Sequence, residues 1–141
     1  MDYKALANEL FQNMIQTRKM SIHKKVDELS HGERKILGYL TFKKNEAISG
    51  ELSEHLHLST PRVAAALNTL SKKGFIKRNR DERDKRMVIV TITESGRSFA
   101  LEEHEKAMVM IEQTLKKLGE HDAQEFVRIM KRIKEIKNES D

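Results

Sequence analysis

Six charged residues in a row separate two strand-like segments in the middle of this chain. They are Asp81, Glu82, Arg83, Asp84, Lys85 and Arg86. Residues 75–80 and 87–93 on either side have the composition of β-strands. In the second strand Val88, Val90 and Ile92 are expected to face one way. The sequence therefore predicts a β-hairpin with arginines at its tip.

Two helices joined by a tight turn are predicted before this hairpin. Ser49 is the expected cap of a short helix that carries Leu52 and Leu56. Only residues 57–58 separate it from a second helix over 59–73, which leaves room for nothing but a tight turn. Two short helices with such a connection describe a helix-turn-helix, although helical hairpins of this kind are common.

The helix over 59–73 has clear start and stop signals. Ser59 or Thr60 can cap it, Pro61 is tolerated because first-turn amides lack helical partners, and Gly74 ends it. Its expected buried stripe is Val63, Leu67 and Leu70. A hairpin with arginines at its tip, placed directly after such a helix, is a wing. The sequence thus predicts a winged helix-turn-helix.

Apolar stripes at helical spacing predict further helices towards both ends of the chain. A first helix over about 3–20 has the stripe Tyr3, Ala7, Leu10 and Met14. A capping box over 30–33 begins another, with the stripe Ile36, Leu37 and Leu40. A long helix that Gly119 closes has the near-heptad stripe Leu101, Met108, Ile111, Leu115 and Leu118. A capping-box-like start at 122–125 introduces the final helix, with Phe126, Ile129, Met130, Ile133 and Ile136.

The terminal helices do not need the wing to bury their stripes. We therefore expect them to pack together and against a second copy of the chain; the alternative is a core within one chain. The predicted fold is mainly α with a small β-hairpin wing, in one compact domain. Its parts are an N-terminal dimerisation helix and connector (1–29), a winged helix-turn-helix region (30–96, with recognition helix 59–73 and wing 75–93) and C-terminal dimerisation helices (97–141).

The net charge of +5 is concentrated in the same central part of the chain. The segment 59–86 holds nine lysines and arginines against three acidic residues, whereas the rest holds 18 against 19. Such a concentration is typical of an electrostatic footprint for phosphate. Because most charge runs are only solvated surface, charge alone leaves both interpretations open.

Composition and motifs exclude several other classes of protein. The chain has no cysteine, so it forms no disulfide, thiolate zinc site or cysteine redox sensor. No stretch approaches the roughly 18 apolar residues of a membrane span, and the N-terminus lacks a signal peptide's apolar run, so we expect a cytoplasmic protein. A nucleophile elbow, a phosphate-binding glycine loop and paired catalytic motifs are absent from the sequence, so we expect neither an enzyme nor a cofactor.

The central block resembles the MarR family of bacterial regulators over residues 70–78, 81–86 and 91–96. That family shows an Asp-x-Arg-Asp-x-Arg wing and a Leu-Thr-x-x-Gly start of the long helix, where this chain has Ile92 in place of the leucine. The resemblance implies a homodimer joined by its terminal helices, with two winged domains in adjacent major and minor grooves of a pseudo-palindromic operator. It also implies repression that a small ligand relieves in many members.

Carried over by position, the resemblance places the recognition helix in the major groove and the wing in the minor groove. Arg62 and Asn68 are the expected base-edge contacts, whereas Ser59 and Thr60 suit phosphate. Family members often have threonine and arginine where this chain has alanines after Val63, so we expect more apolar contact with thymine methyl groups. The candidate DNA-binding residues are Ser59, Thr60, Pro61, Arg62, Ala65, Asn68, Lys72, Arg78, Arg83, Asp84 and Arg86.

Within the wing, Arg83 and Arg86 are the candidates for the narrow minor groove of A·T-rich DNA. A carboxylate two residues before an arginine can hold its guanidinium by charge-assisted hydrogen bonds. We therefore expect Asp84 to orient Arg86 and Asp81 to orient Arg83. The alternative is a hairpin tip of exposed salt bridges.

Two alternative functions remain open at this point. A metal-responsive regulator of the same fold would need its scattered histidines to meet, for example as a cluster of His23, His31 and His104, whereas His55 and His57 lie on different helix faces. No metal site is predicted from the spacing. A winged helix used for protein contacts alone is the second alternative. The seven methionines could line a ligand cleft, but such residues are more often plain core.

Overall fold

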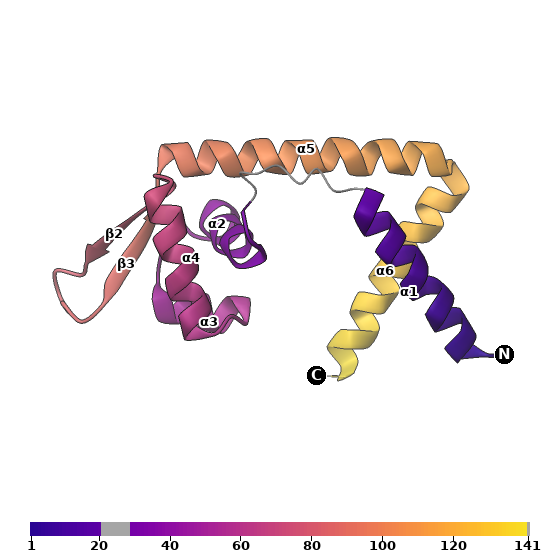
Figure 1. The fold of residues 1–141 in the computed structure, drawn as a ribbon, viewed down its shortest axis with the longest axis horizontal. Helices are drawn as coiled ribbons and strands as arrows, with labels where there is room; N and C mark the ends of the chain where they lie inside the picture. The colour runs from indigo at the N-terminus through magenta and orange to yellow at the C-terminus, as the bar shows by residue number, and fades with distance from the viewer. Residues whose placement is uncertain (21–28, 141) are drawn as a thin grey trace. The chain divides into compact units, whose positions relative to one another are not determined.

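The computed structural model describes residues 1–20 and 29–140 and divides the chain into two units, Met1–Ser30 and His31–Asp141. The first unit is the helix α1 (Tyr3–Met20), at whose start the Asp2 carboxylate accepts the Ala5 backbone N–H at 3.1 Å. The second unit contains α2 (His31–Phe42), α3 (Ser49–Leu56), α4 (Thr60–Lys72), α5 (Glu94–Leu118) and α6 (Glu120–Ser140) together with a small sheet (Figure 1). The predicted fold class, mainly helical with a winged helix-turn-helix, is confirmed.

The sheet has three antiparallel strands, in the order β1-β3-β2. The predicted hairpin is present as β2 (Ile76–Arg80) and β3 (Val88–Ile92), in a register that pairs Arg78 with Val90. The expectation of only two strands was wrong, because β1 (Glu46–Ile48) pairs with the other edge of β3 and sets Ala47 opposite Val90. This third strand fixes the base of the wing against the helices.

The core of the second unit lies where α2, α3 and α4 meet the sheet. The predicted stripe of α4 is buried, and the stripe of α2 packs against it. The most deeply buried side chains are Ile36, Leu37, Leu40, Leu52, Val63, Leu70 and Val90. Because the helical members of this set occupy the inner faces of α2–α4, the outer face of α4 is left exposed.

The turn between α3 and α4 is as short as the sequence indicates. His57 adopts the left-handed conformation (φ 53°) at the end of α3, and Ser59 caps α4 by accepting the Arg62 backbone N–H at 3.3 Å. The expectation that Ser49 caps α3 was wrong. Ile48 occupies the cap position without a side-chain hydrogen bond, because β1 leads directly into the helix and makes Ser49 its first residue.

Gly119 separates the two C-terminal helices, as predicted. Its positive φ of 89° breaks α5, and its carbonyl oxygen accepts the Ala123 backbone N–H at 2.9 Å. The following helix therefore begins at Glu120. The predicted start at 122–125 was too late because these residues already lie inside the first turns of α6.

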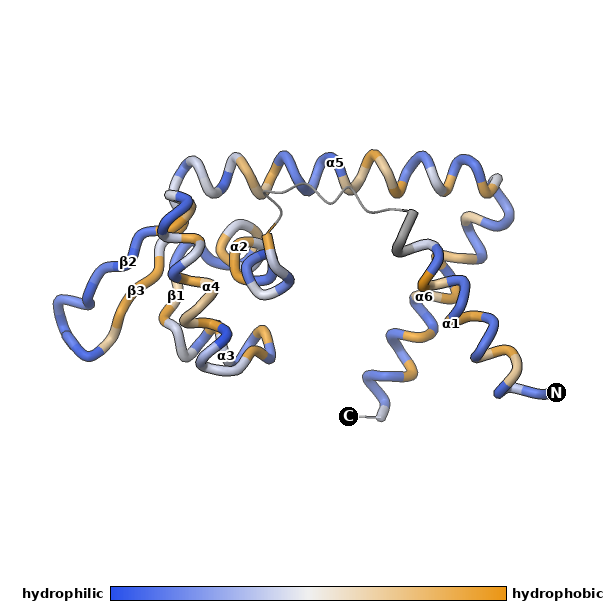
Figure 2. Tube along the Cα trace, viewed as in Figure 1, coloured by the Kyte–Doolittle hydropathy of each residue, from blue (hydrophilic) through white to orange (hydrophobic). Residues whose placement is uncertain are grey.

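Large apolar side chains remain exposed along α5 and α6. Figure 2 shows hydrophobic residues spread along both helices. Along Glu120–Ser140, no residue of α6 is buried. The exposed apolar residues on the two helices are Leu101, Met108, Val109, Met110, Ile111, Leu118, Phe126, Val127, Ile129, Met130, Ile133 and Ile136. Among the described residues, no helix has the length and apolar character needed to cross a membrane.

Gly96 is a position where the backbone leaves no room for a side chain. It is buried in the first turn of α5, where Thr93 caps the helix and donates its own N–H to the Phe75 carbonyl at 3.0 Å. A Cβ atom on Gly96 would come within 2.2 Å of that carbonyl oxygen. We therefore expect Gly96→Ala to lower the free energy of unfolding by about 2–3 kcal/mol, measured by urea denaturation.

A matched control for this variant is Gly38→Ala in α2. A Cβ atom there meets nothing within 4 Å, so alanine should leave stability unchanged or raise it by up to about 1 kcal/mol through its helix propensity. Equal stabilities for the two variants would contradict a tight passage of α5 over the start of the wing.

Candidate nucleic-acid interface

The outer face of α4 carries every recognition-helix residue that the sequence predicted for DNA contact. The inner face is closed off by the core, so these residues are free to meet a partner from outside. These residues, all exposed, are Ser59, Thr60, Pro61, Arg62, Ala65, Asn68 and Lys72. At this end Ser59 accepts the Arg62 backbone N–H with its side chain and the Val63 N–H with its carbonyl oxygen, and Pro61 has no N–H, so the start of α4 presents mainly side chains to a partner.

A hydrogen bond joins this face to the first strand of the wing. Arg78, in the middle of β2, donates from Nη1 to the Asn68 side-chain oxygen at 2.7 Å. Both residues are exposed. The sequence predicted both as site residues but contained no signal for their contact, because they lie ten positions apart on different elements.

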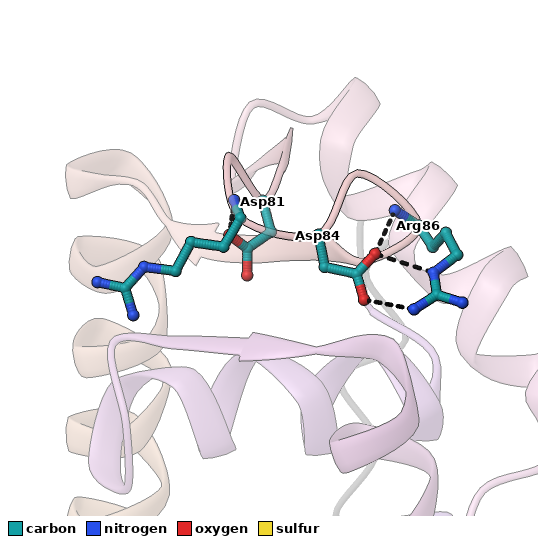
Figure 3. A network of polar contacts seen from close by, with 4 residues as sticks. Asp81, Asp84 and Arg86 are labelled. Carbon is teal, nitrogen blue, oxygen red and sulfur yellow. Dashed lines mark hydrogen bonds and ion pairs between the residues drawn. The ribbon is translucent and has the colours of Figure 1, made fainter.

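At the tip of the wing, Asp84 holds the Arg86 guanidinium in a two-point contact (Figure 3). Arg86 donates from Nε to Oδ1 at 3.0 Å, from Nη2 to Oδ2 at 3.1 Å and from its backbone N–H to Oδ1 at 3.1 Å. The expected pairing of these residues is therefore present. The Arg86 side chain is nevertheless 90% exposed, so its remaining N–H groups can serve as donors to a partner.

The same hydrogen bonds shift the pKa values of both Asp84 and Arg86. The side-chain hydrogen bonds from Arg86, and then its backbone N–H, hold the pKa of the Asp84 carboxyl below its ordinary value of 3.8. The Asp84 carboxylate in turn raises the pKa of Arg86. Both groups thus stay charged at neutral pH, and the contact is lost only in acid, as the pH falls through the lowered pKa of Asp84.

Asp81 shapes the loop in a different way from the one predicted. Its carboxylate accepts the Arg83 backbone N–H at 2.8 Å (Figure 3), whereas we expected it to hold the Arg83 guanidinium. Asp81 also donates its backbone N–H to the Met87 carbonyl at 2.9 Å. An aspartate that bonds the backbone two residues on forms a local turn, so Asp81 orders the main chain of the loop.

The central part of the chain matches a known family model. Residues 18–103 match the model described as the transcriptional regulator SarA/Rot. This match covers more than half of the chain. The chain belongs to the SarA/Rot family of transcriptional regulators. It is therefore a transcriptional regulator and not an enzyme.

The relatives of this SarA/Rot-family chain agree with that assignment. It is 25% identical over 138 residues to the HTH-type transcriptional regulator YwhA of Bacillus subtilis, covering 94% of this chain and 99% of that protein. It resembles FabT of Streptococcus pneumoniae, whose crystal structure is a complex with DNA, with a TM-score of 0.75 and 20% identity over 99% of this chain and 100% of that one.

A MarR transcriptional regulator from Methanosarcina mazei Go1 also has this fold. Its TM-score is 0.71 at 19% identity, and the match covers 97% of this chain and 99% of that one. The resemblance to MarR regulators predicted from the wing and the start of the long helix is confirmed, with SarA/Rot as the family whose model matches.

One contact that the sequence did not indicate fastens α5 of this SarA/Rot-family chain to the winged region. Arg97 donates from Nη1 to the Thr41 carbonyl at 3.3 Å and from Nη2 to the Asn45 side-chain oxygen. These partners precede Arg97 by more than 50 residues, so no local pattern could reveal them. The contact ties the long helix to the end of α2 and to Asn45 just before β1.

The histidines do not form a metal site within the part of the chain that the structure describes. No group of three histidine or carboxylate side chains suited to a metal ion occurs among residues 1–20 and 29–140. His104 instead lies against Phe42, with ring centroids 5.1 Å apart. His23 lies outside the described residues, so the cluster that includes it is not addressed by this observation.

Proposed function

We propose that this regulator is a homodimer that binds double-stranded DNA of a specific sequence, with α4 in the major groove and the wing in the minor groove. The observation that carries the proposal is the Asp84–Arg86 contact at the exposed tip of the hairpin. It holds the Arg86 guanidinium in place and leaves its other N–H groups exposed to solvent. Arginines suit the strongly negative potential of a narrow minor groove. FabT, which shares the fold, was solved in complex with DNA.

In this arrangement the exposed residues of α4 and of the wing contact different parts of the DNA. Arg62 and Asn68 meet base edges, and Ala65 touches a thymine methyl group. Ser59 and Thr60 bind phosphate beside Pro61. The positive side chains that complete the footprint are Lys72, Arg78, Arg83 and Arg86, with Asp84 as the orienting group.

A second copy of the chain is proposed to pack against the exposed apolar residues of the terminal helices. One chain leaves the stripes of α5 and α6 exposed, and α1 likewise exposes Leu10, Phe11 and Met14. Exposed apolar area of this extent marks an interaction surface. A two-fold dimer repeats the winged domain symmetrically, so its operator is a pseudo-palindrome.

The biological role we propose is repression that a small ligand relieves. This step rests on the resemblance to MarR regulators, many of which respond to such a ligand. A regulator of this kind meets its operator in the bacterial cytoplasm. The proposed partners are therefore double-stranded DNA, a second copy of the chain and a small-molecule effector.

Sequence selection with the full-length protein tests this function. DNA fragments bound at low salt should converge on one pseudo-palindromic sequence, and affinity for that sequence should exceed affinity for random DNA by about a thousandfold or more. Binding should also fall steeply between low and moderate salt, because Lys and Arg release counterions from phosphate. Failure to enrich any sequence would support instead a winged helix used for protein contacts.

A further inference from the structure

The contact between Arg78 and Asn68 decides which way the Asn68 amide faces. An arginine side chain has only donors, so the group within 2.7 Å of its Nη1 must be the amide oxygen. The oxygen and the NH₂ group of an amide diverge from the same carbon, so they do not both face the same donor. The Asn68 oxygen therefore faces β2, and its NH₂ group faces away from the strand.

This orientation bears on base recognition because asparagine usually reads adenine with both halves of its amide. The oxygen accepts a proton from adenine N6 while the NH₂ group donates to adenine N7. Guanine instead presents two acceptors, N7 and O6, at the same edge. An asparagine whose oxygen is turned towards β2 by Arg78 directs its NH₂ donors at the base, and these donors match the acceptors of guanine better than the donor-acceptor pair of adenine.

The chemistry of the Arg78 contact differs from that at the wing tip. Arg86 is paired with a carboxylate, whereas Arg78 donates to a neutral amide. Its positive charge therefore remains available to strengthen the N–H donors of the Asn68 amide through polarisation. It also places a full charge next to the proposed major-groove surface, beside an exposed recognition helix.

We propose that Arg78 is a positioning residue that turns Asn68 into a donor and thereby makes the regulator select guanine over adenine at one base pair of each half-site. The inference rests on the proposed DNA binding and adds a specificity-determining role for a residue of the wing strand. It couples the base preference of α4 to a side chain of β2, so the recognition helix and the wing do not read DNA independently.

The test compares the sequences selected from random DNA by the full-length protein and by four variants. In Asn68→Ala, one base pair of the half-site should lose its sequence preference. That base pair is the one that Asn68 contacts. At that base pair the wild type should prefer guanine over adenine by about tenfold. Arg78→Ala should abolish this preference or reverse it towards adenine, because the freed amide can then make the two-point adenine contact.

Arg80→Ala is the matched control for the loss of charge. Arg80 lies two residues further along the same strand and is also exposed. Its replacement should weaken binding to all sequences alike and keep the guanine preference. In the double variant Asn68→Ala/Arg78→Ala, that base pair should be as indifferent as in Asn68→Ala alone, since Arg78 acts on the preference through Asn68.

A readout without DNA follows the amide itself. In the NMR spectrum of the free protein, Arg78→Ala should shift the two side-chain NH₂ proton signals of Asn68, whereas Arg80→Ala should leave them in place. Unshifted signals in Arg78→Ala would overturn the contact on which the inference depends.

The outcomes also separate this inference from the function on which it rests. Failure of the wild type to select any sequence defeats the proposed function, and the inference with it. A wild type that selects an operator, while Arg78→Ala keeps the guanine preference or Asn68→Ala alters no base pair, overturns only the role of Arg78.

Discussion

Replacing Arg86 with alanine should lower the affinity of the regulator for its operator about a hundredfold and leave its stability unchanged. Each wing loses one guanidinium, and the proposed dimer loses two, each costing about 1–2 kcal/mol of binding. The side chain is 90% exposed and contributes nothing to the core. The slope of log affinity against log salt should fall by about one for each arginine lost. Fluorescence anisotropy at several salt concentrations, together with urea denaturation, measures both effects.

Two substitutions of neighbouring acids separate orientation from simple charge. Asp84→Asn removes a negative charge near DNA, yet it should weaken binding because it removes the carboxylate that holds Arg86 at two points. Glu82→Gln removes the same charge from the same exposed loop and should strengthen binding slightly. If Asp84→Asn instead strengthened binding as Glu82→Gln does, the wing contact would be an ordinary surface ion pair.

The core of the winged domain was predictable because its signals are local. Val63, Leu67 and Leu70 repeat at helical spacing, and Ser59 and Gly74 mark the ends of α4. The wing follows from two strand-like runs around a charged segment. Each of these patterns lies within a few residues of the structure that it specifies.

β1 was missed because its three residues are too few to show the alternation of a strand. Its identity depends on pairing with β3, more than 40 residues further along the chain. The contacts of Arg78 with Asn68 and of Arg97 with Asn45 were missed for the same reason. They join elements whose relative placement only the packed core decides.

The two aspartates of the wing show how equal spacing can lead to different contacts. Asp81 and Asp84 each accept the backbone N–H of the residue two positions on, which the turn preference of aspartate explains. Arg86 also folds its guanidinium back onto the Asp84 carboxylate. The sequence pattern predicted the same guanidinium contact for Asp81, where the structure shows a backbone contact. Spacing alone therefore did not determine which group of the arginine each carboxylate binds.

Placing a lysine at Ile133 should separate the proposed dimer into monomers and lower operator affinity by about a hundredfold or more. Ile129, Ile133 and Ile136 form one stripe on α6, and each is more than 40% exposed in the single chain. In a two-fold interface the substitution buries a charge twice, which association cannot compensate. Two linked winged domains bind a palindrome far more tightly than one, because the second contact becomes intramolecular.

The control variant, Asn138→Lys, adds the same charge and a good helix former outside that stripe. It should remain a dimer of twice the 16.4 kDa chain mass in sedimentation equilibrium, whereas Ile133→Lys should sediment as a single chain. Both should retain the helical circular dichroism of the wild type at low temperature. If Ile133→Lys stays dimeric and binds the operator normally, the apolar stripe of α6 does not form the dimer interface and must pack against some other surface.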